Sequence, residues 1–229
     1  MISFPEEPPR PRRVEIAPGA VHLPGWLPME QQQKLVAACR EWARGPVPMR
    51  HTRLPGGGMM SVQSLHLGWY WRPYRYSRTA DDHNGARVAD LPDWLADLGR
   101  SVVDAAYDPD PGADAEYRPD VALINYYDRD AKMGLHQDKE ERTDAPVVSL
   151  SIGDRCVFRF GNTETRNRPW TDVELASGDA FVFGGPSRFA YHGVPKLYPD
   201  TGPAETGLPA GRLNLTLRVT GIAPEETEK

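Results

Sequence analysis

The sequence predicts an α+β fold in which two helices come first and a run of antiparallel strands follows, built as a sandwich or jelly roll. Two features predict this order: apolar residues recur at helical spacing in two early segments, and from Val121 onward they recur with a period of about two. The 229 residues include 21 Gly and 23 Pro, which favours short strands over long helices. This length suits one domain-sized core that needs no disulfide or metal to fold.

Each expected helix has an apolar stripe and a clear end. The first covers residues 29–44 and stops at Gly45-Pro46, and the second covers residues 91–107 and is entered through Pro92. A Pro-rich segment, residues 108–112, ends the second helix. The stripes, which mark the buried faces, are Leu35, Ala38, Cys39 and Trp42 in the first helix and Trp94, Leu95, Leu98, Val102 and Ala105 in the second.

Six short strands are expected after Val121, separated by turns that contain Gly, Asp or Asn. They cover residues 122–127, 147–152, 156–160, 173–175, 180–183 and 213–219. The two chain ends differ from this core. Residues 1–13 are rich in Pro and charge and predict a flexible arm, and residues 222–229 predict an acidic tail.

The composition predicts a reduced, cytoplasmic protein. No apolar run reaches the ~18 residues that a membrane span needs, the N-terminus lacks the regions of a signal peptide, and Cys39 and Cys156 match no metal spacing. We expect a monomer with no membrane partner. The net charge of −5 argues at first against a nucleic-acid partner, because proteins that bind nucleic acid usually carry a basic excess.

His136 and Asp138 are the first candidate site residues. They lie two positions apart, so in an extended segment both side chains point to the same side. The next His is His192, and two His with one carboxylate form the facial triad of non-haem Fe(II) oxygenases, which leaves positions open for a co-substrate and O₂. A structural zinc site would need four protein ligands. Taken alone, each residue is explained as readily by a solvated surface pair or a His in a Gly-rich turn.

The segment 212–218 alternates polar and apolar residues without exception. One face carries Leu213, Leu215 and Leu217, and the other carries Arg212, Asn214, Thr216 and Arg218. A solvated edge strand usually mixes charges, whereas this polar face holds two Arg and no acid. If it points into a barrel, the guanidinium groups need anionic partners, because unpaired buried charge is costly. A dicarboxylate such as 2-oxoglutarate suits both, since Arg binds carboxylates through a planar fork.

Together these motifs resemble the AlkB family of Fe(II)/2-oxoglutarate-dependent dioxygenases. The resemblance extends from Ile16 to Gly221 and is densest after Val121. The motifs that carry it are Asn125-Tyr126-Tyr127, Leu135-His136-Gln137-Asp138-Lys139-Glu140, the segment 146–153, Gly184-Gly185-Pro186-Ser187-Arg188, Tyr191-His192-Gly193 and the strand 212–218.

The resemblance implies a double-stranded β-helix (jelly-roll) core in residues 121–221. Residues 14–120 would hold the N-terminal helices and a nucleotide-recognition lid, as one structural unit with the core. The implied activity is DNA repair: Fe(II), 2-oxoglutarate and O₂ are used to remove alkyl groups from N1 of adenine and N3 of cytosine, as in 1-methyladenine and 3-methylcytosine. Formaldehyde, succinate and CO₂ are the implied products, and the implied partner is alkylated DNA, single- or double-stranded.

The resemblance also implies a role for each matching residue. The iron ligands are His136, Asp138 and His192; the co-substrate contacts are Asn125, Tyr127, Ser149, Arg212, Asn214 and Arg218; the substrate contacts are Trp69, Tyr74, Tyr76, Glu140 and Arg166. Trp69 would stack on the flipped base from the side opposite His136. The segment after Trp69 is shorter than in the bacterial family member, so either Tyr74 or Tyr76 is the next aromatic of the pocket. Phe183 stands where that member has Trp.

The charge of residues 42–80, which we call the lid, differs from that of the rest of the chain. The lid contains six Arg and no Asp or Glu, so its net charge is +6, and the remainder carries −11. Its aromatic residues are Trp42, Trp69, Tyr70, Trp71, Tyr74 and Tyr76. Arg interleaved with aromatic residues suits a phosphate backbone and exposed bases. The alternative is a hairpin whose aromatic side chains simply pack on the core.

Two other functions stay open from the sequence. The same chemistry on tRNA or mRNA differs by the 2′-OH, and no residue here reads that group clearly. A non-enzymatic, cupin-like binding module leaves the joint presence of the triad and the two Arg unexplained.

Overall fold

The computed structural model describes residues 13–73, 75–107 and 117–223. The predicted arm and tail lie almost entirely outside these residues, as does the segment expected to end the second helix, so these three expectations stay predictions. Among the described residues, no helix is both long and apolar enough to cross a membrane.

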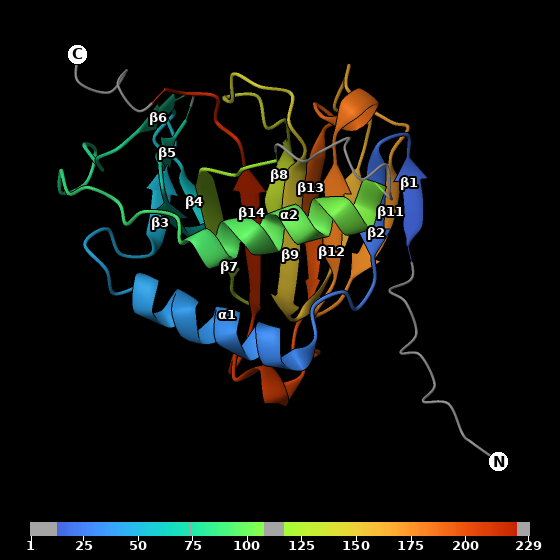
Figure 1. The fold of residues 1–229 in the computed structure, drawn as a ribbon, viewed down its shortest axis with the longest axis horizontal. Coiled ribbons are helices and arrows are strands. Elements are labelled where there is room, and N and C mark those ends of the chain that lie inside the picture. Colours follow the sequence, from blue (N-terminus) through green and yellow to red (C-terminus); the bar gives the residue numbers. More distant parts are fainter. Residues whose placement is uncertain (1–12, 74, 108–116, 224–229) are drawn as a thin grey trace.

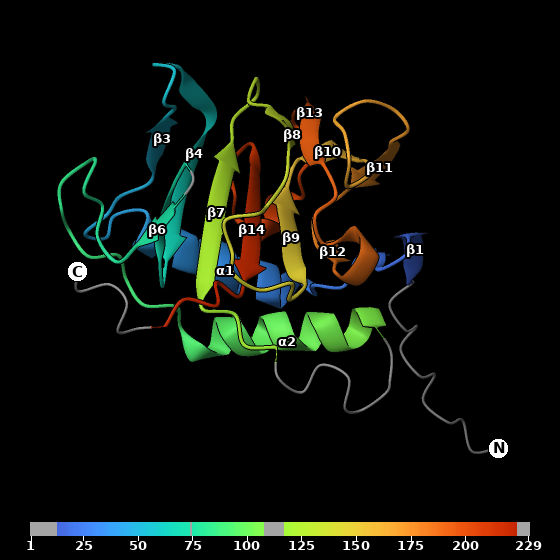
Figure 2. The same cartoon turned by 90° about the horizontal axis from the view of Figure 1, so that it is seen from above.

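Two antiparallel sheets form the core (Figures 1 and 2). The major sheet has eight strands, in the order β1 (Val14–Ala17), β2 (Ala20–Leu23), β12 (Ala180–Phe183), β9 (Val147–Gly153), β14 (Arg212–Arg218), β7 (Val121–Tyr127), β4 (Met59–Leu67) and β3 (Arg50–Arg53). The minor sheet has four, in the order β11 (Thr171–Leu175), β10 (Arg155–Phe160), β13 (His192–Tyr198) and β8 (Met133–His136). A separate hairpin joins β5 (Tyr70–Arg72) and β6 (Arg75–Ser77). The predicted α+β, jelly-roll fold is confirmed.

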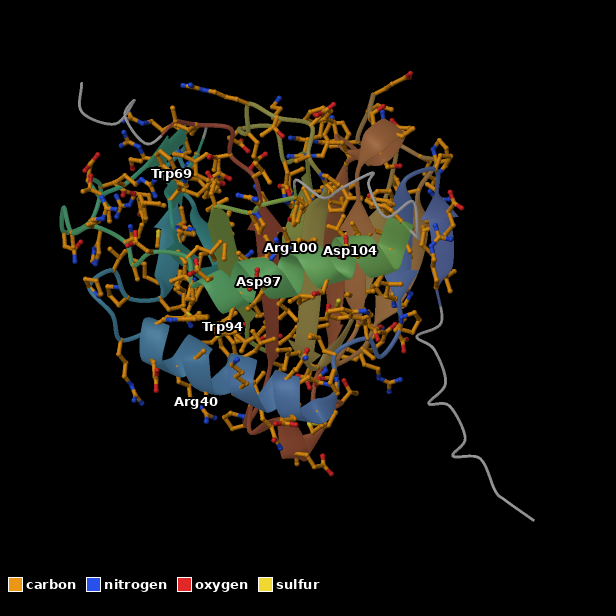
Figure 3. All side chains as sticks on the ribbon, in the orientation of Figure 1. Arg40, Trp69, Trp94, Asp97, Arg100 and Asp104 are labelled. Atoms are coloured by element: carbon orange, nitrogen blue, oxygen red, sulfur yellow. The ribbon has the colours of Figure 1, made fainter. Side chains whose placement is uncertain are left out.

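The two helices cover the outer face of the major sheet, and the minor sheet lies on the other side (Figure 2). The helices α1 (Met29–Trp42) and α2 (Asp93–Tyr107) match the two predicted helices to within two residues at each end. Their predicted stripes pack with apolar side chains of β14, β7 and β9 in one core cluster. Between the helices the rings of Trp42 and Trp94 stack at 6.0 Å. Asp97, Arg100 and Asp104 lie on the polar side of α2 (Figure 3).

A second apolar cluster fills the space between the sheets. Its members come from both sheets and include Tyr127, Val147, Phe158, Phe160, Phe181 and Phe183. Pairing of β12 with β9 and of β10 with β13 places the rings of Phe158 and Phe183 beside His192, with ring centroids 5.8 and 4.8 Å from its own. The functional residues therefore sit at the mouth of a densely packed interior.

All six predicted strands are present, whereas two strands that carry candidate ligands were not expected. β8 has four residues and contains Gly134, and β13 contains Gly193 and Pro195, so neither shows a strand signal in the sequence. The lid also contributes more than a hairpin. Its strands β3 and β4 extend the major sheet beside β7, and β1 and β2 extend the opposite edge, so residues before 121 complete the core sheet.

At two positions, Gly68 and Gly193, only glycine fits, because a side chain would collide with the backbone of a neighbouring segment. Gly68 adopts φ +77°, and a Cβ there would lie 1.9 Å from the backbone oxygen of Asp120. Gly193, next to His192, would carry its Cβ 2.7 Å from the backbone oxygen of Met133. Each position allows close approach of two backbones, and the second brings β8 and β13 together at the candidate iron ligands.

Candidate active site

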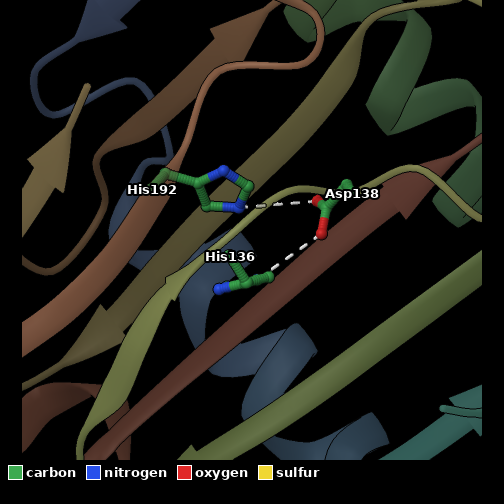
Figure 4. A group of neighbouring side chains, drawn as sticks. All are labelled: His136, Asp138 and His192. Atoms are coloured by element: carbon green, nitrogen blue, oxygen red, sulfur yellow. Dashed lines mark ion pairs between the residues drawn. The ribbon is translucent and has the colours of Figure 1, made fainter. Parts of the chain in front are cut away.

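His136, Asp138 and His192 lie together at the end of the minor sheet (Figure 4). His136 ends β8 and His192 begins β13, and the antiparallel register places them opposite each other with ring centroids 4.5 Å apart. Asp138 follows two residues after β8, and its carboxylate oxygens lie 3.5 Å from the Nε2 atoms of His136 and His192. One donor atom from each residue lies within 4.8 Å of the others. The predicted triad is thus brought together.

Hydrogen bonds orient both imidazole rings for binding through Nε2. Nδ1 of His136 lies 2.9 Å from the backbone oxygen of Gly134, and Nδ1 of His192 lies 3.0 Å from that of Ala190. Because a carbonyl oxygen only accepts, each Nδ1 must carry the proton and donate it. Nε2 is then left with a lone pair that points toward Asp138, which is the tautomer that a metal ion needs.

The protonation states also suit a cation. Burial lowers the pKa of His192 to about 4, so its ring is neutral near neutral pH. Burial raises the pKa of Asp138, but the Arg218 guanidinium and the two imidazoles outweigh it and hold that pKa well below its usual range. Burial lowers the pKa of His136, yet the hydrogen bond and the charge of Asp138 raise it on balance. The cluster therefore presents one carboxylate and imidazoles that a divalent cation can hold.

A cavity opens beside the three residues. Its walls combine polar side chains of β7, β9 and β14 with two Phe rings. The lining residues are Asn125, Tyr127, Met133, His136, Asp138, Ser149, Phe158, Phe183, His192, Gly193, Val194, Asn214, Thr216 and Arg218. The polar face of β14 thus points inward, as its alternation predicted, because β7 and β9 pair with it on both sides.

Arg218 is buried and already paired with two carboxylates. Its Nη2 lies 2.7 Å from Oδ2 of Asp138, and its Nη1 lies 3.0 Å from Oε1 of Glu141. The expected need of a buried Arg for anionic partners is thus met by the protein itself at Arg218, and a contact of Arg218 with 2-oxoglutarate stays a prediction. The acids come from the connection between β8 and β9, which the pattern of β14 alone cannot reveal. Glu141 was missed because nothing in the sequence distinguishes it from Glu140.

Arg212, at the other end of β14, has no carboxylate partner among the described residues. It is 1% exposed, its Nη2 donates to Ser151 Oγ at 2.9 Å, and its guanidinium lies 5.1 Å from the ring centre of Tyr127. Its Nε and Nη1 are buried without a hydrogen-bond partner. Buried polar groups are nearly always satisfied, so this guanidinium indicates a missing anionic partner.

Comparison with known proteins identifies the family. Residues 19–218 match the model of the 2OG-Fe(II) oxygenase superfamily. AlkB of Escherichia coli is 38% identical over 180 residues, which cover 76% of this chain and 78% of that protein. The AlkB homolog of Caulobacter vibrioides is 37% identical over 211 residues, covering 89% of this chain and 88% of that protein. The chain belongs to the AlkB family of Fe(II)/2-oxoglutarate-dependent dioxygenases.

The fold comparison agrees with this membership. The solved structure of OsALKBH1 superposes with a TM-score of 0.80 at 31% identity, covering 91% of this chain and 100% of that one. Other AlkB-type relatives are named as DNA N(6)-methyladenine demethylases of Arabidopsis thaliana and a tRNA demethylase of Schizosaccharomyces pombe. The chain spans 50% of the length of the Arabidopsis protein ALKBH1D.

The residues present fit the iron and the co-substrate of AlkB-type enzymes. His136, Asp138 and His192 would hold Fe(II), with one side of the ion open to the cavity. A carboxylate of 2-oxoglutarate would satisfy the two unpartnered nitrogens of Arg212. Around this position, Asn214 Nδ2 donates to Ser149 Oγ at 2.7 Å, and Ser64 Oγ donates to Asn125 Oδ1 at 2.6 Å.

Five of the six predicted co-substrate residues line the cavity, and the sixth, Arg212, is buried beside Tyr127. Burial raises the pKa of Tyr127 to about 12, so its phenol is a neutral donor near neutral pH. Thr216 also lines the cavity. It was visible on the polar face of β14 but was not singled out. The individual contacts to 2-oxoglutarate stay predictions.

Trp69 is placed differently from what the AlkB resemblance suggested. Its ring is 1% exposed, its Nε1 donates to Asp120 Oδ2 at 3.0 Å, and the Arg78 guanidinium lies 3.8 Å from its ring centre. Trp69 lies at the lid end of the sheet (Figure 3) and does not line the cavity. Stacking of Trp69 on a base stays a prediction.

The other lid aromatics mostly follow the alternative interpretation, in which they pack on the core. Tyr70 is 2% exposed and Tyr76 is 8% exposed. Trp42 belongs to the helical layer, where it stacks on Trp94. Trp71 is half-buried, and Tyr74 lies outside the described residues. The choice between Tyr74 and Tyr76 as the base-pocket residue therefore stays a prediction, although Tyr76 already has a protein partner, Glu141.

The last two predicted substrate residues lie outside the cavity lining. Glu140 is half-buried, and its carboxylate accepts from the backbone nitrogen of Lys139 at 3.3 Å. Arg166 is exposed on the connection between β10 and β11, and its guanidinium lies 5.7 Å from the ring centre of Tyr191, which precedes His192. The substrate roles of Glu140 and Arg166 stay predictions.

Proposed function

We propose that this enzyme repairs DNA by oxidative demethylation of alkylated bases, with 1-methyladenine and 3-methylcytosine as its substrates. One observation supports this most strongly: the iron triad is exposed on one side only. The side chain of His136 is 37% exposed, whereas those of Asp138 and His192 are 3% and 9% exposed. A base therefore approaches the iron over the His136 ring, and the co-substrate occupies the buried side.

The charge of the lid supports a nucleic-acid substrate. Arg44, Arg53 and Arg75 are exposed, and the lid has a net charge of +6 in a protein of −5. Cationic side chains on the lid attract the phosphate backbone and release counterions from it, so binding should weaken steeply with salt. The Arabidopsis relatives that are named as DNA N(6)-methyladenine demethylases support DNA as the target.

The residues of the chain supply binding, orientation and exclusion of water. A methylated base pairs poorly, so extruding it from the helix costs less than extruding a normal base. Arg212 would hold the distal carboxylate of 2-oxoglutarate, and the hydrogen bonds at Nδ1 keep both His rings fixed. When bound, Fe(II) with O₂ and 2-oxoglutarate supplies oxidation of the methyl C–H bond, with succinate and CO₂ as co-products. The hydroxymethylated base then loses formaldehyde and regains its normal structure.

The test is a side-by-side assay of 1-methyladenine and 3-methylcytosine in matched DNA and RNA oligomers. We expect equal amounts of formaldehyde and succinate from the DNA oligomers, and no product from the Asp138→Ala variant. Turnover of 2-oxoglutarate without any change in the methylated DNA would contradict the proposal. Faster demethylation of the RNA oligomers would favour the tRNA or mRNA alternative.

A further inference from the structure

A buried chain of polar contacts joins the lid to the iron ligand Asp138. The Tyr76 hydroxyl, on strand β6 of the lid, donates to Oε1 of Glu141 at 2.5 Å. The same oxygen accepts from Nη1 of Arg218 at 3.0 Å, and Nη2 of Arg218 pairs with Oδ2 of Asp138 at 2.7 Å. The side chains of Glu141, Arg218 and Asp138 are 0%, 7% and 3% exposed. Water therefore screens these contacts little.

Arg188 holds Glu141 and Asp138, two members of this series of contacts, from the side away from Tyr76. Its Nη2 pairs with Oε2 of Glu141 at 3.1 Å, and its Nη1 donates to the backbone oxygen of Asp138 at 2.7 Å. Its Nε donates to the backbone oxygen of Ala145 at 2.6 Å. Arg188 thus holds the connection between β8 and β9 in place whatever the lid does. Among these contacts of Glu141, the one with Tyr76 is then the one that can change when the lid moves, because Tyr76 belongs to the lid.

We propose that Glu141 and Tyr76 are positioning residues that set how strongly Asp138 can hold the metal, and that they do so through Arg218. One guanidinium is shared between two carboxylates, and a divalent cation competes with Arg218 for the carboxylate of Asp138. A negative Glu141 draws Arg218 away from Asp138. The hydroxyl of Tyr76 donates at 2.5 Å to the Glu141 oxygen that Arg218 also uses, and its contact with Nη1 of Arg218 is much longer, at 3.4 Å. Its main effect is therefore to weaken that pull. Movement of strand β6 would therefore change the affinity of Asp138 for the metal.

The proposal predicts opposite effects for two variants. In Glu141→Gln, Arg218 keeps only Asp138 as an anionic partner, so metal affinity should fall by about tenfold, as is common for groups that orient ligands. In Tyr76→Phe, Glu141 accepts more strongly from Arg218, so metal affinity should rise by about threefold, because only part of the strength of the lost hydrogen bond is transferred to Arg218. The inference rests on the iron site of the AlkB family and not on the identity of the nucleic-acid substrate.

The chain offers a matched control in Tyr117→Phe. The Tyr117 hydroxyl is also buried and donates to the backbone oxygen of Leu217 at 3.1 Å, next to Arg218 but without touching Glu141. Co(II) titrations of the metal-free full-length protein, followed by visible absorption, give the metal affinity of each variant, and thermal unfolding gives its stability. We expect both Tyr variants to lose stability while only Tyr76→Phe and Glu141→Gln change Co(II) affinity, in opposite directions. Unchanged Co(II) affinity in these two variants, or a change of the same sign in both, would overturn the proposal.

Discussion

Arg212 and Arg218 stand at the two ends of the same strand and on the same face, yet their surroundings are opposite. Arg218 contacts the carboxylates of Asp138 and Glu141, whereas Arg212 contacts a Ser151 hydroxyl and the ring of Tyr127 and keeps two nitrogens without a partner. The difference arises because both acids lie on the connection after β8, which reaches only one end of β14. We therefore propose different functions for these two identical residues: Arg212 would bind a carboxylate of the co-substrate, and Arg218 would position the metal ligand Asp138.

The largest effect is expected at the carboxylate beside Arg218. Asp138→Ala removes an iron ligand and one of the two anions around that guanidinium, so demethylation should fall by at least about 10³-fold. Formaldehyde release and Co(II) titration measure the loss. Asp200→Ala is the control, because Asp200 is 70% exposed and pairs with Arg129 away from the cavity. Comparable losses in both variants would show that the triad is not the metal site.

At the other end of the strand, Arg212→Lys tests whether the fork geometry matters. Lysine keeps the charge but offers no planar pair of donors, so the Kd of 2-oxoglutarate should rise by about tenfold or more. Calorimetric titration at saturating metal measures this Kd. Arg155→Lys is the matched control, because Arg155 is half-exposed and pairs with Glu174 on the minor sheet. Full affinity in Arg212→Lys would mean that the co-substrate carboxylate is held elsewhere.

His66 tests whether the charge of Arg218 also affects a neighbouring strand, because this charge contributes to the lowered pKa of the His66 imidazole. It lies opposite Leu123, which is paired with Thr216 of β14, and both of its ring nitrogens lack a partner. Burial, then the charges of Arg50 and Arg218, lower its pKa from 6.5 to about 3. The unfolded chain thus binds this proton more readily than the folded one, so stability is lost as pH falls below 6.5.

Between about pH 7.5 and pH 5, His66 should cost the folded protein about 2 kcal/mol. Urea unfolding of the wild type and of His66→Phe at both pH values isolates this contribution, because all other titrating groups are shared. The wild type should lose about 2 kcal/mol more than the variant over this interval. Equal losses would show that His66 is protonated in the folded state or hydrated there.

The smallest effect is expected for Tyr127→Phe. The ring that lies against the Arg212 guanidinium is kept, and only the neutral hydroxyl is removed. The Kd of 2-oxoglutarate should rise by a few-fold, about the value of one uncharged hydrogen bond. A loss as large as that of Arg212→Lys would mean that the hydroxyl, and not the guanidinium, is the main contact. The same calorimetric titration decides between them.

Much of the cavity could be predicted from the sequence because its signals are local. The alternation over residues 212–218 separated the two faces of β14, of which the polar face supplies Asn214, Thr216 and Arg218 to the cavity. The two-residue spacing of His136 and Asp138 correctly placed both side chains on one side. Both patterns depend only on the geometry of an extended chain. The helices were found to within two residues because their apolar stripes are long.

The features that were missed depend on contacts between distant segments. Glu141 differs from Glu140 only in meeting Arg188 and Arg218, which lie 47 and 77 residues away. The contacts of Trp69 with Asp120 and Arg78 were likewise not expected, whereas its stacking on a base stays a prediction. Strands β8 and β13 form because the two segments pair with each other and because β13 also pairs with β10. None of these contacts leaves a periodic pattern in the sequence.

One pair of titrations tests the division of work along β14 most directly. The Kd of Co(II), and the Kd of 2-oxoglutarate at saturating Co(II), are measured for Arg212→Gln and Glu141→Gln. Arg212→Gln should weaken 2-oxoglutarate binding by at least about tenfold and leave Co(II) binding unchanged, whereas Glu141→Gln should weaken Co(II) binding by about tenfold with little effect on 2-oxoglutarate. If each variant weakens both ligands to the same extent, the two ends of the strand do not have separate functions.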